Sequence, residues 1–219
     1  MSRSLRKLGA IDTKHLSRHT PALPSPPMTE RWKPSVTVAA IIEQVMAGES
    51  RFLLVEETTP EGLKLNNPAG HLELGESPQQ AVVREALEET ARVFTPDCLV
   101  GVYLSRFQRP AVIGPSGCAT NPAGAAAPDA AQWSAGEDVT YLRLAFAGTV
   151  SEPDPARALD DGIVRTLWMT LAELRASRER HRSALVLKCI EDFVAGKRLP
   201  LDAITADSTL YAPEIKSGR

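Results

Sequence analysis

The chain has 219 residues, of which 43% are hydrophobic and 24% are charged, proportions typical of a globular domain. No uncharged apolar run is long enough to predict a membrane span. Basic residues concentrate in residues 1–33, and the acidic remainder argues against a nucleic-acid-binding face. We therefore expect no nucleic-acid or membrane partners, and composition leaves the choice between a monomer and a homodimer open.

Composition also predicts the domain organisation. Residues 1–30 form a basic extension rich in proline near its end, either a disordered tail or residues upstream of a true start at Met28. Residues 31–204 are expected to form one domain, interrupted at about 109–137 by an insertion rich in Ala, Pro and Gly. So long a stretch is either a functional lid or disordered, and its low complexity favours disorder. Residues 205–219 are expected to be a tail.

The cysteines indicate the redox compartment. Cys98, Cys118 and Cys189 are odd in number and far apart, which does not suit a disulfide framework. No Cys/His spacing suggests zinc. We expect free thiols and a cytoplasmic protein.

Hydrophobic patterning predicts the secondary structure in chain order. An apolar, β-branched run is followed by a turn and a second strand, which together indicate a hairpin. A loop rich in turn formers precedes a well-marked helix, and an alternating segment later in the chain is typical of a strand. The expected strands are 35–42, 51–56, 63–65, 99–104, 139–150 and 165–169; the loop is 66–70; and helices follow at 78–90, 171–177 and 183–195, the last ended by Gly196.

The first helix carries the most informative pattern. Ser77 is a good N-cap, Pro78 suits the first helical position, and Gln80 completes a capping box. A helical projection separates two sides of this helix. The expected packing side holds Val83, Ala86, Leu87 and Thr90, and the opposite side holds Glu85, Glu88 and Glu89.

These three carboxylates lie at i, i+3 and i+4, so their like charges repel on one helix face. A solvated acidic face is one interpretation. A site for Mg²⁺, or Mn²⁺ as a substitute, is the other, because both ions prefer oxygen donors. Gly70 would let a backbone carbonyl come close as a further ligand. Such a site suits hydrolysis at phosphorus, with Arg84 holding Glu76 in an ion pair that fixes the loop to the helix.

The full motif resembles that of the Nudix hydrolases, G-x5-E-x7-R-E-U-x-E-E-x-G-U, where U is a bulky aliphatic residue. The matching charged positions are Glu76, Arg84, Glu85, Glu88 and Glu89, after Gly70. Ala86 is small for its position. Ala91 replaces the usual glycine and Arg92 the usual aliphatic residue, and we expect these departures to alter the local turn and not the catalysis.

Further segments, including NNPAGHLE and YLRLAFA, are similar to the NudJ-type Nudix phosphatases. The resemblance implies an α/β (α+β) fold with a mixed β-sheet sandwiched between helices. It also implies Mg²⁺-dependent phosphate release from nucleoside tri- and diphosphates, and from thiamine diphosphate or its pyrimidine pyrophosphate precursor. Glu85, Glu88 and Glu89 would be metal ligands with the Gly70 carbonyl, and Glu85 would also act on the attacking water. Glu76 and Arg84 would stabilise the junction between the loop and the helix.

Candidates for substrate binding lie outside the motif. Tyr141 and Arg143 share one strand face, as a stacking ring and a phosphate-binding cation, or simply as an exposed face. Trp133 could stack on a base or cap the core. His71 could contact phosphate or be structural, and Arg92 would reach phosphate only if the helix continues that far.

Two alternative functions remain open on the sequence. One is a Nudix pyrophosphohydrolase that cleaves nucleotide-sugar or ADP-ribose diphosphates. The other is a non-catalytic module that binds a nucleotide and regulates a partner, although such modules usually lose a motif carboxylate.

Overall fold

The computed structural model describes residues 32–108 and 138–211. The predicted extension, the insertion with Trp133 and Cys118, and the residues after Tyr211 lie outside the described residues. Pro34 is the first residue of the compact unit described below. Within the described ranges, none of the helices has the length and apolarity needed to cross a membrane.

The described strands form one mixed sheet with the order β3-β2-β1-β6-β5, in which β4 also pairs with β1 and β7 with β2. The β1–β6 pair is parallel and the other pairs are antiparallel. The strands are β1 Ser35–Met46, β2 Glu49–Thr59, β3 Gly62–Asn66, β4 Ala69–His71, β5 Phe94–Gln108, β6 Asp138–Val150 and β7 Ile163–Thr170.

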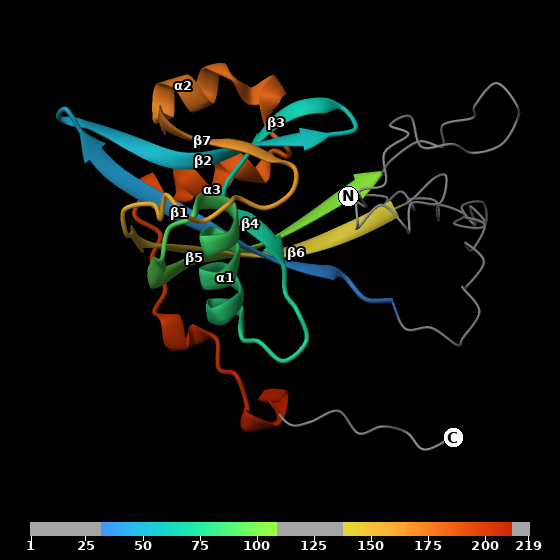
Figure 1. Cartoon of the computed structure of the whole chain (residues 1–219). Helices are drawn as coiled ribbons and strands as arrows, with labels where there is room; N and C mark the ends of the chain where they lie inside the picture. The colour runs from blue at the N-terminus through green and yellow to red at the C-terminus, as the bar shows by residue number, and fades with distance from the viewer. Residues whose placement is uncertain (1–31, 109–137, 212–219) are drawn as a thin grey trace, which may run out of the picture. The chain divides into compact units, whose positions relative to one another are not determined.

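Strand β1 joins two halves of this sheet (Figure 1). Its residues 35–42 pair with β6, and residues 37–39 also pair with β4 on the other side. Its last residues, 43–46, pair with β2 instead. The half formed by β4, β1, β6 and β5 is therefore continuous with the half formed by β3, β2 and β7.

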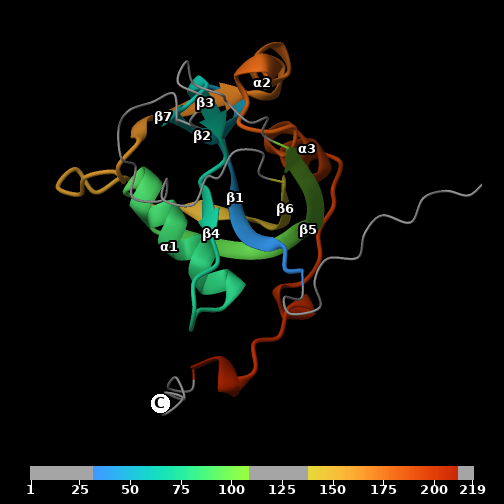
Figure 2. The same cartoon turned by 90° about the vertical axis from the view of Figure 1, so that its right-hand side faces the viewer.

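Helices cover both faces of the sheet. Helix α1 (Pro78–Thr90) packs with Val38, Ala40 and Phe146 in one core cluster. Helices α2 (Leu171–Ala176) and α3 (Leu185–Val194) pack with Ile41 and Ala145 in another. Because alternate residues of a strand point to opposite faces, these helices lie on opposite sides of β1, as Figure 2 shows for α1 and α3. The predicted mixed sheet between helices is confirmed.

Helix α1 begins as predicted, with Ser77 accepting from the Gln80 amide and a complete capping box. Its predicted packing side is partly wrong. Ala81 and Val82 are fully buried together with Ala86, whereas Val83 and Leu87 are only partly buried. The helix is rotated toward β4 because that strand supplies polar contacts for the carboxylate side, described below.

Several strand boundaries also differ from the sequence interpretation. The predicted loop 66–70 contains β4, whose residues are held by backbone hydrogen bonds to β1. Strand β5 starts at Phe94 and not at residue 99, because its irregular first half still pairs with β6. The strands expected at 139–150 and 165–169 are confirmed within one or two residues.

Candidate active site

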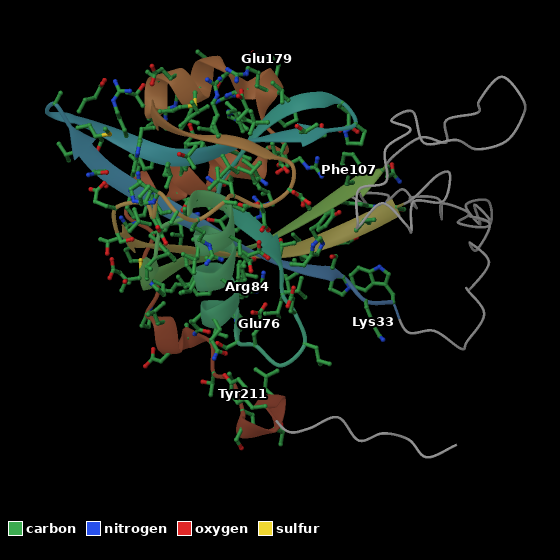
Figure 3. All side chains as sticks on the ribbon, in the orientation of Figure 1. Lys33, Glu76, Arg84, Phe107, Glu179 and Tyr211 are labelled. Carbon is green, nitrogen blue, oxygen red and sulfur yellow. The ribbon has the colours of Figure 1, made fainter. Side chains whose placement is uncertain are left out.

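Arg84 organises the junction between the loop after β4 and helix α1, and Figure 3 labels it together with Glu76. Its Nε and Nη2 donate to the two carboxylate oxygens of Glu76 at 3.0 and 2.7 Å. Nη2 also donates to the carbonyl oxygen of His71 at 3.0 Å. This bidentate contact lowers the pKa of Glu76 below its usual value. The expected Glu76–Arg84 ion pair is therefore present, and it ties loop to helix.

The remaining nitrogen of Arg84 bridges two further carboxylates. Nη1 donates to Glu85 Oε1 at 2.8 Å and to Glu88 Oε2 at 3.0 Å. The guanidinium thus supplies one positive charge between acidic groups that would otherwise repel each other. Glu89 is held differently, because the Ala69 amide donates to its Oε2 at 2.8 Å.

Gly70 meets the carboxylate of Glu85 at the closest point between β4 and α1. A Cβ added at Gly70 would lie 2.1 Å from Glu85 Oε1 and 2.3 Å from Oε2, with Gly70 itself paired to Val38 in the sheet. No side chain can occupy that space without displacing the carboxylate. Glycine therefore lets the backbone of β4 approach the acidic side of the helix while the Glu85 carboxylate keeps its position.

Glu85 and Glu89 are buried, at 8% and 9% exposure, although both are acidic. Burial raises the pKa of Glu85, and the hydrogen bond from Arg84 only partly opposes this effect. Burial raises the pKa of Glu89 well above its usual value, and the charges of Glu85, Glu57 and Asp160 raise it further. We call the carboxylates of Glu85, Glu88 and Glu89 the acidic pole. Because Glu85 and Glu89 are buried with raised pKa values, a positive charge beside them would be favourable.

Glu57 and Asp160 are acidic neighbours of the pole that the sequence did not single out. Glu57 lies near the end of β2, and Asp160 lies before β7, where its amide donates to the Glu88 carbonyl at 3.0 Å. Both residues lie far from helix α1 in the sequence, so the motif alone did not point to them. The only signal in the sequence was a Glu56–Glu57 pair directly after the apolar run of a strand.

These residues fit a divalent cation by their donor chemistry. Within residues 32–108 and 138–211, no three acidic, histidine or cysteine side chains form a ready-made metal cluster. The contacts explain this result, since Arg84 takes oxygens of Glu85 and Glu88 and the Ala69 amide takes one of Glu89. A guanidinium already stands where a cation is favoured, beside buried oxygens that Mg²⁺ and Mn²⁺ prefer.

The structure brings three of the predicted substrate residues together. The rings of His71 and Tyr141 lie 6.3 Å apart between centroids, at 45° to each other. Thr37 pairs with His71 on one side and Arg143 on the other. Arg143 is only 9% exposed, so the interpretation of an exposed strand face is wrong for this residue. The chain buries it because α3 covers that face.

The end of the motif helix differs from the expectation for Arg92. The helix stops at Thr90, and Ala91 adopts the left-handed conformation, with φ of 54°, that favours glycine. Arg92 therefore turns away from the acidic pole. It donates to the Ser151 carbonyl at 2.9 Å and lies 5.8 Å from the centre of the Trp168 ring. A phosphate contact by Arg92 is excluded in this arrangement.

Two surface hollows lie away from the buried carboxylates. One, of about 380 Å³, is lined by Glu76, Pro78 and residues 205–210 of the C-terminal segment. That segment is fixed by the Tyr211 hydroxyl, which lies 3.2 Å from Gln80 Oε1. The other, of about 440 Å³, lies along α3 beside His181. Neither is lined by Glu85, Glu88 or Glu89.

Comparison with known proteins identifies the family. A family model described as "NUDIX domain" matches residues 34–188, well over half of the chain. The chain belongs to the Nudix hydrolase family. Proteins called "Phosphatase NudJ" from Shigella boydii serotype 4 and from Escherichia coli K12 are each 30% identical to it over 174 residues, covering 79% of this chain and 92% of the relative.

A solved structure shows the same fold. It is described as a "NUDIX hydrolase from Nitrosomonas europaea", is 44% identical, and covers 80% of this chain and 98% of that chain with a TM-score of 0.61. The Nudix family, the fold and the assignment as a hydrolase are therefore confirmed.

Proposed function

We propose that this Nudix hydrolase is a Mg²⁺-dependent phosphohydrolase that releases phosphate from nucleoside tri- and diphosphates. Thiamine diphosphate and its pyrimidine pyrophosphate precursor belong to the same proposal. The observation that carries it is the close approach of the Gly70 backbone to the Glu85 carboxylate, which leaves no room for a side chain at residue 70 unless that carboxylate moves. The likeness to proteins called "Phosphatase NudJ" supports release of phosphate over other bond choices.

The proposed roles follow from position and charge. Glu85, Glu88 and Glu89 would hold the metal together with the Gly70 carbonyl, and Mn²⁺ could replace Mg²⁺. When bound, the metal neutralises phosphate charge and acidifies a water molecule. Glu85 would accept a proton from the attacking water, a role suited to a carboxylate whose pKa is raised by burial. Arg84 and Glu76 keep the loop and helix in register.

Substrate contacts are proposed on the other side of β4. Tyr141 and His71 present two tilted rings that can stack on a flat group of the substrate. Trp133, outside the described residues, is proposed for the same purpose. The chain is proposed to work in the cytoplasm, consistent with Cys98 and Cys189 being free thiols.

The deciding experiment is a substrate panel that includes GTP, CTP and thiamine diphosphate, with and without Mg²⁺. Phosphorus NMR of the products separates phosphate release from cleavage that yields pyrophosphate or two monophosphates. Turnover of nucleotide sugars or ADP-ribose in place of the panel would favour the pyrophosphohydrolase alternative. Binding without turnover in the presence of Mg²⁺ would favour a regulatory module.

A further inference from the structure

A polar row crosses the sheet on the face opposite α1. Cross-strand partners lie on the same face of a sheet. His71 pairs with Thr37, Thr37 with Arg143, and Arg143 with Tyr103. The row therefore spans β4, β1, β6 and β5 in one line, on the face that α3 covers.

The next row on that face contains only small residues. Ala69 pairs with Ala39, Ala39 with Ala145, and Ala145 with Gly101. Ala39 and Ala145 are fully buried, and Ala145 packs in the same core cluster as α3. Small residues alone define no site, so the polar groups around them decide what this surface does.

Some atoms of the buried polar groups lack hydrogen bonds. Within the described part of the chain, six such side-chain atoms belong to residues of the polar row or to residues at the ends of β2 and β3. We call their residues the interior polar cluster: Thr37 (Oγ1), Glu57 (Oε1), Asn66 (Oδ1), Asn67 (Oδ1 and Nδ2) and Arg143 (Nη1). Arg143 is 9% exposed and Asn67 only 1%.

Pairing and charge bring the members of the cluster together. Asn66 pairs with Val55 of β2, two residues before Glu57, and a hydrogen bond from its side chain reaches Glu57. Glu57 Oε1 lies 3.9 Å from Arg182 Nε, too far for a hydrogen bond. Burial lowers the pKa of Arg143, and the charges of Glu57 and Glu89 oppose that effect. The cluster therefore lies next to the acidic pole.

A purely structural role leaves these groups unexplained. Each buried polar group without a partner costs about 1–3 kcal/mol, and native proteins keep few of them. All six atoms are themselves buried, and Glu57, whose side chain is 20% exposed, is the most exposed member of the cluster. Such a set suits a molecule that enters from the Glu57 side and satisfies the free groups.

The mixture of donors and acceptors indicates the kind of molecule. Arg143 and the Asn67 Nδ2 donate, whereas Glu57 and the Asn66 Oδ1 accept. A phosphate offers only acceptors and a negative charge, so Glu57 and Asn66 would repel it. A flat heterocycle with an N–H or amino group beside a ring acceptor satisfies both kinds of group.

We propose that the interior polar cluster binds the heterocyclic ring of the substrate, with Arg143 donating to a ring acceptor and Glu57 accepting from the adjacent N–H. This inference rests on the proposed function and refines it. Arg143, expected from the sequence to bind phosphate, instead contacts the ring. The phosphates extend toward Glu89.

The first test compares a nucleotide with a substrate that has no ring. We would measure kcat/KM for nucleoside triphosphates and for inorganic tripolyphosphate, in the full chain with Mg²⁺. Arg143→Met and the isosteric Thr37→Val should lower the ratio of the two values by about tenfold to a hundredfold, mainly through KM. Arg175→Met, which breaks only an exposed pair with Glu191, is the matched control and should leave the ratio unchanged.

The second test needs neither turnover nor metal. Saturation-transfer NMR in EDTA would detect adenosine, cytidine, guanosine, uridine and thiamine on the wild-type protein. The signal should be lost in Arg143→Met and Thr37→Val and kept in Arg175→Met. Preference for adenosine, cytidine and thiamine would identify an amino edge, and preference for guanosine and uridine a lactam edge.

The outcomes separate this inference from the proposed function. Ring binding without any hydrolysis would reject the proposed function and keep the inference. An equal loss of activity on nucleotide and tripolyphosphate, without ring binding, would make Arg143 a phosphate contact and overturn it. An unchanged ratio together with no ring binding would mean that ordered water fills the cluster, and would also overturn it.

Discussion

Glu56 and Glu57 are neighbours on β2, yet they sit in opposite electrostatic environments. Glu56 accepts from Arg165 at 2.7 Å and from Arg180 at 2.6 Å, and these contacts hold its pKa below the usual value. Glu57 has one oxygen without a hydrogen bond, and burial raises its pKa. The strand therefore directs one carboxylate to a fully paired cluster and the next to the interior polar cluster.

The difference shows how one residue type serves two purposes. The Glu56 cluster joins β2 to β7 and to the segment Arg178–Arg180, so it holds the fold together. The pole of Glu85 and Glu89 has too few positive partners, and this imbalance is what a cation or a substrate can relieve. Paired acids stabilise the fold here, and underpaired acids indicate the site.

The largest expected effect comes from removing a carboxylate of the pole. Glu85→Gln should lower Mg²⁺-dependent kcat by about a hundredfold to ten-thousandfold, because the base for the attacking water is lost. Phosphate release under saturating substrate measures this change. Glu56→Gln is the matched control and should keep kcat close to the wild-type value. An equal loss of kcat in both variants would mean that the acidic pole and the Glu56 cluster do not differ in function.

For the free energy of unfolding, Glu56→Gln should have the larger effect and Glu85→Gln the smaller one. Glu56→Gln should lower the free energy of unfolding by about 2 kcal/mol, because two charge-assisted hydrogen bonds are weakened. Urea unfolding of the metal-free protein measures it. Glu85→Gln should cost less than this, since it removes a buried charge that Arg84 only partly compensates. A larger loss for Glu85→Gln would contradict the comparison.

Mg²⁺ should stabilise the folded protein only by binding to the acidic pole of helix α1. At a concentration about tenfold above its Kd, the ion should add about 1.4 kcal/mol to the free energy of unfolding. Thermal unfolding with Mg²⁺ and with EDTA gives the shift in Tm. Glu56→Gln should keep that shift and Glu89→Gln should lose most of it. An unchanged shift in Glu89→Gln would remove this residue from the proposed ligand set.

The pH dependence should have opposite signs for the two environments. The folded pKa of Glu89 is raised above the usual 4.5, so its contribution is present below that value and is lost as pH rises through the folded pKa. The folded pKa of Glu56 is lowered, so its contribution is present above 4.5 and is lost as pH falls through the folded pKa.

Urea unfolding in EDTA, between about pH 3.5 and pH 8, checks these signs. Glu89→Gln should flatten the fall in stability toward high pH. Glu56→Gln should flatten the fall toward low pH. If both variants changed the same limb of the profile, the assignment of paired and underpaired acids would be wrong.

The smallest expected effect concerns backbone conformation and not charge. Ala91→Gly should raise the free energy of unfolding by about 0.5 kcal/mol, because alanine is strained at φ of 54° and glycine is not. Ala195→Gly is the matched control, since Ala195 ends α3 with φ of −70°. That change should lower stability slightly. A loss of stability in both variants would mean that Ala91 is unstrained.

The sequence predicted most of the fold and the charged motif because both depend on local patterns. Capping residues marked the start of α1, and alternation marked β6. The packing side of α1 was predicted only in part, because the Ala69 amide and Arg84 allow Glu89 and Glu85 to be buried as well.

The rest of the site depends on contacts between distant segments. Glu57 and Asp160 reach the pole from β2 and from the loop before β7, and no spacing in the sequence relates them to Glu85. From the sequence, Arg143 was interpreted either as a phosphate-binding cation or as part of an exposed strand face. Its burial depends on α3, which follows more than 40 positions later.

The double membership of β1 has a mechanical consequence. Residues up to Ile42 belong with β6, and Glu43 already pairs with Phe52 of β2. The Arg143 side and the Glu57 side of the interior polar cluster are therefore connected by one unbroken strand. Any widening between them must flex the backbone around these two residues. The amide protons at that bend should exchange faster when the two sides separate. Hydrogen exchange of the β1 amides would therefore report whether the cluster is occupied.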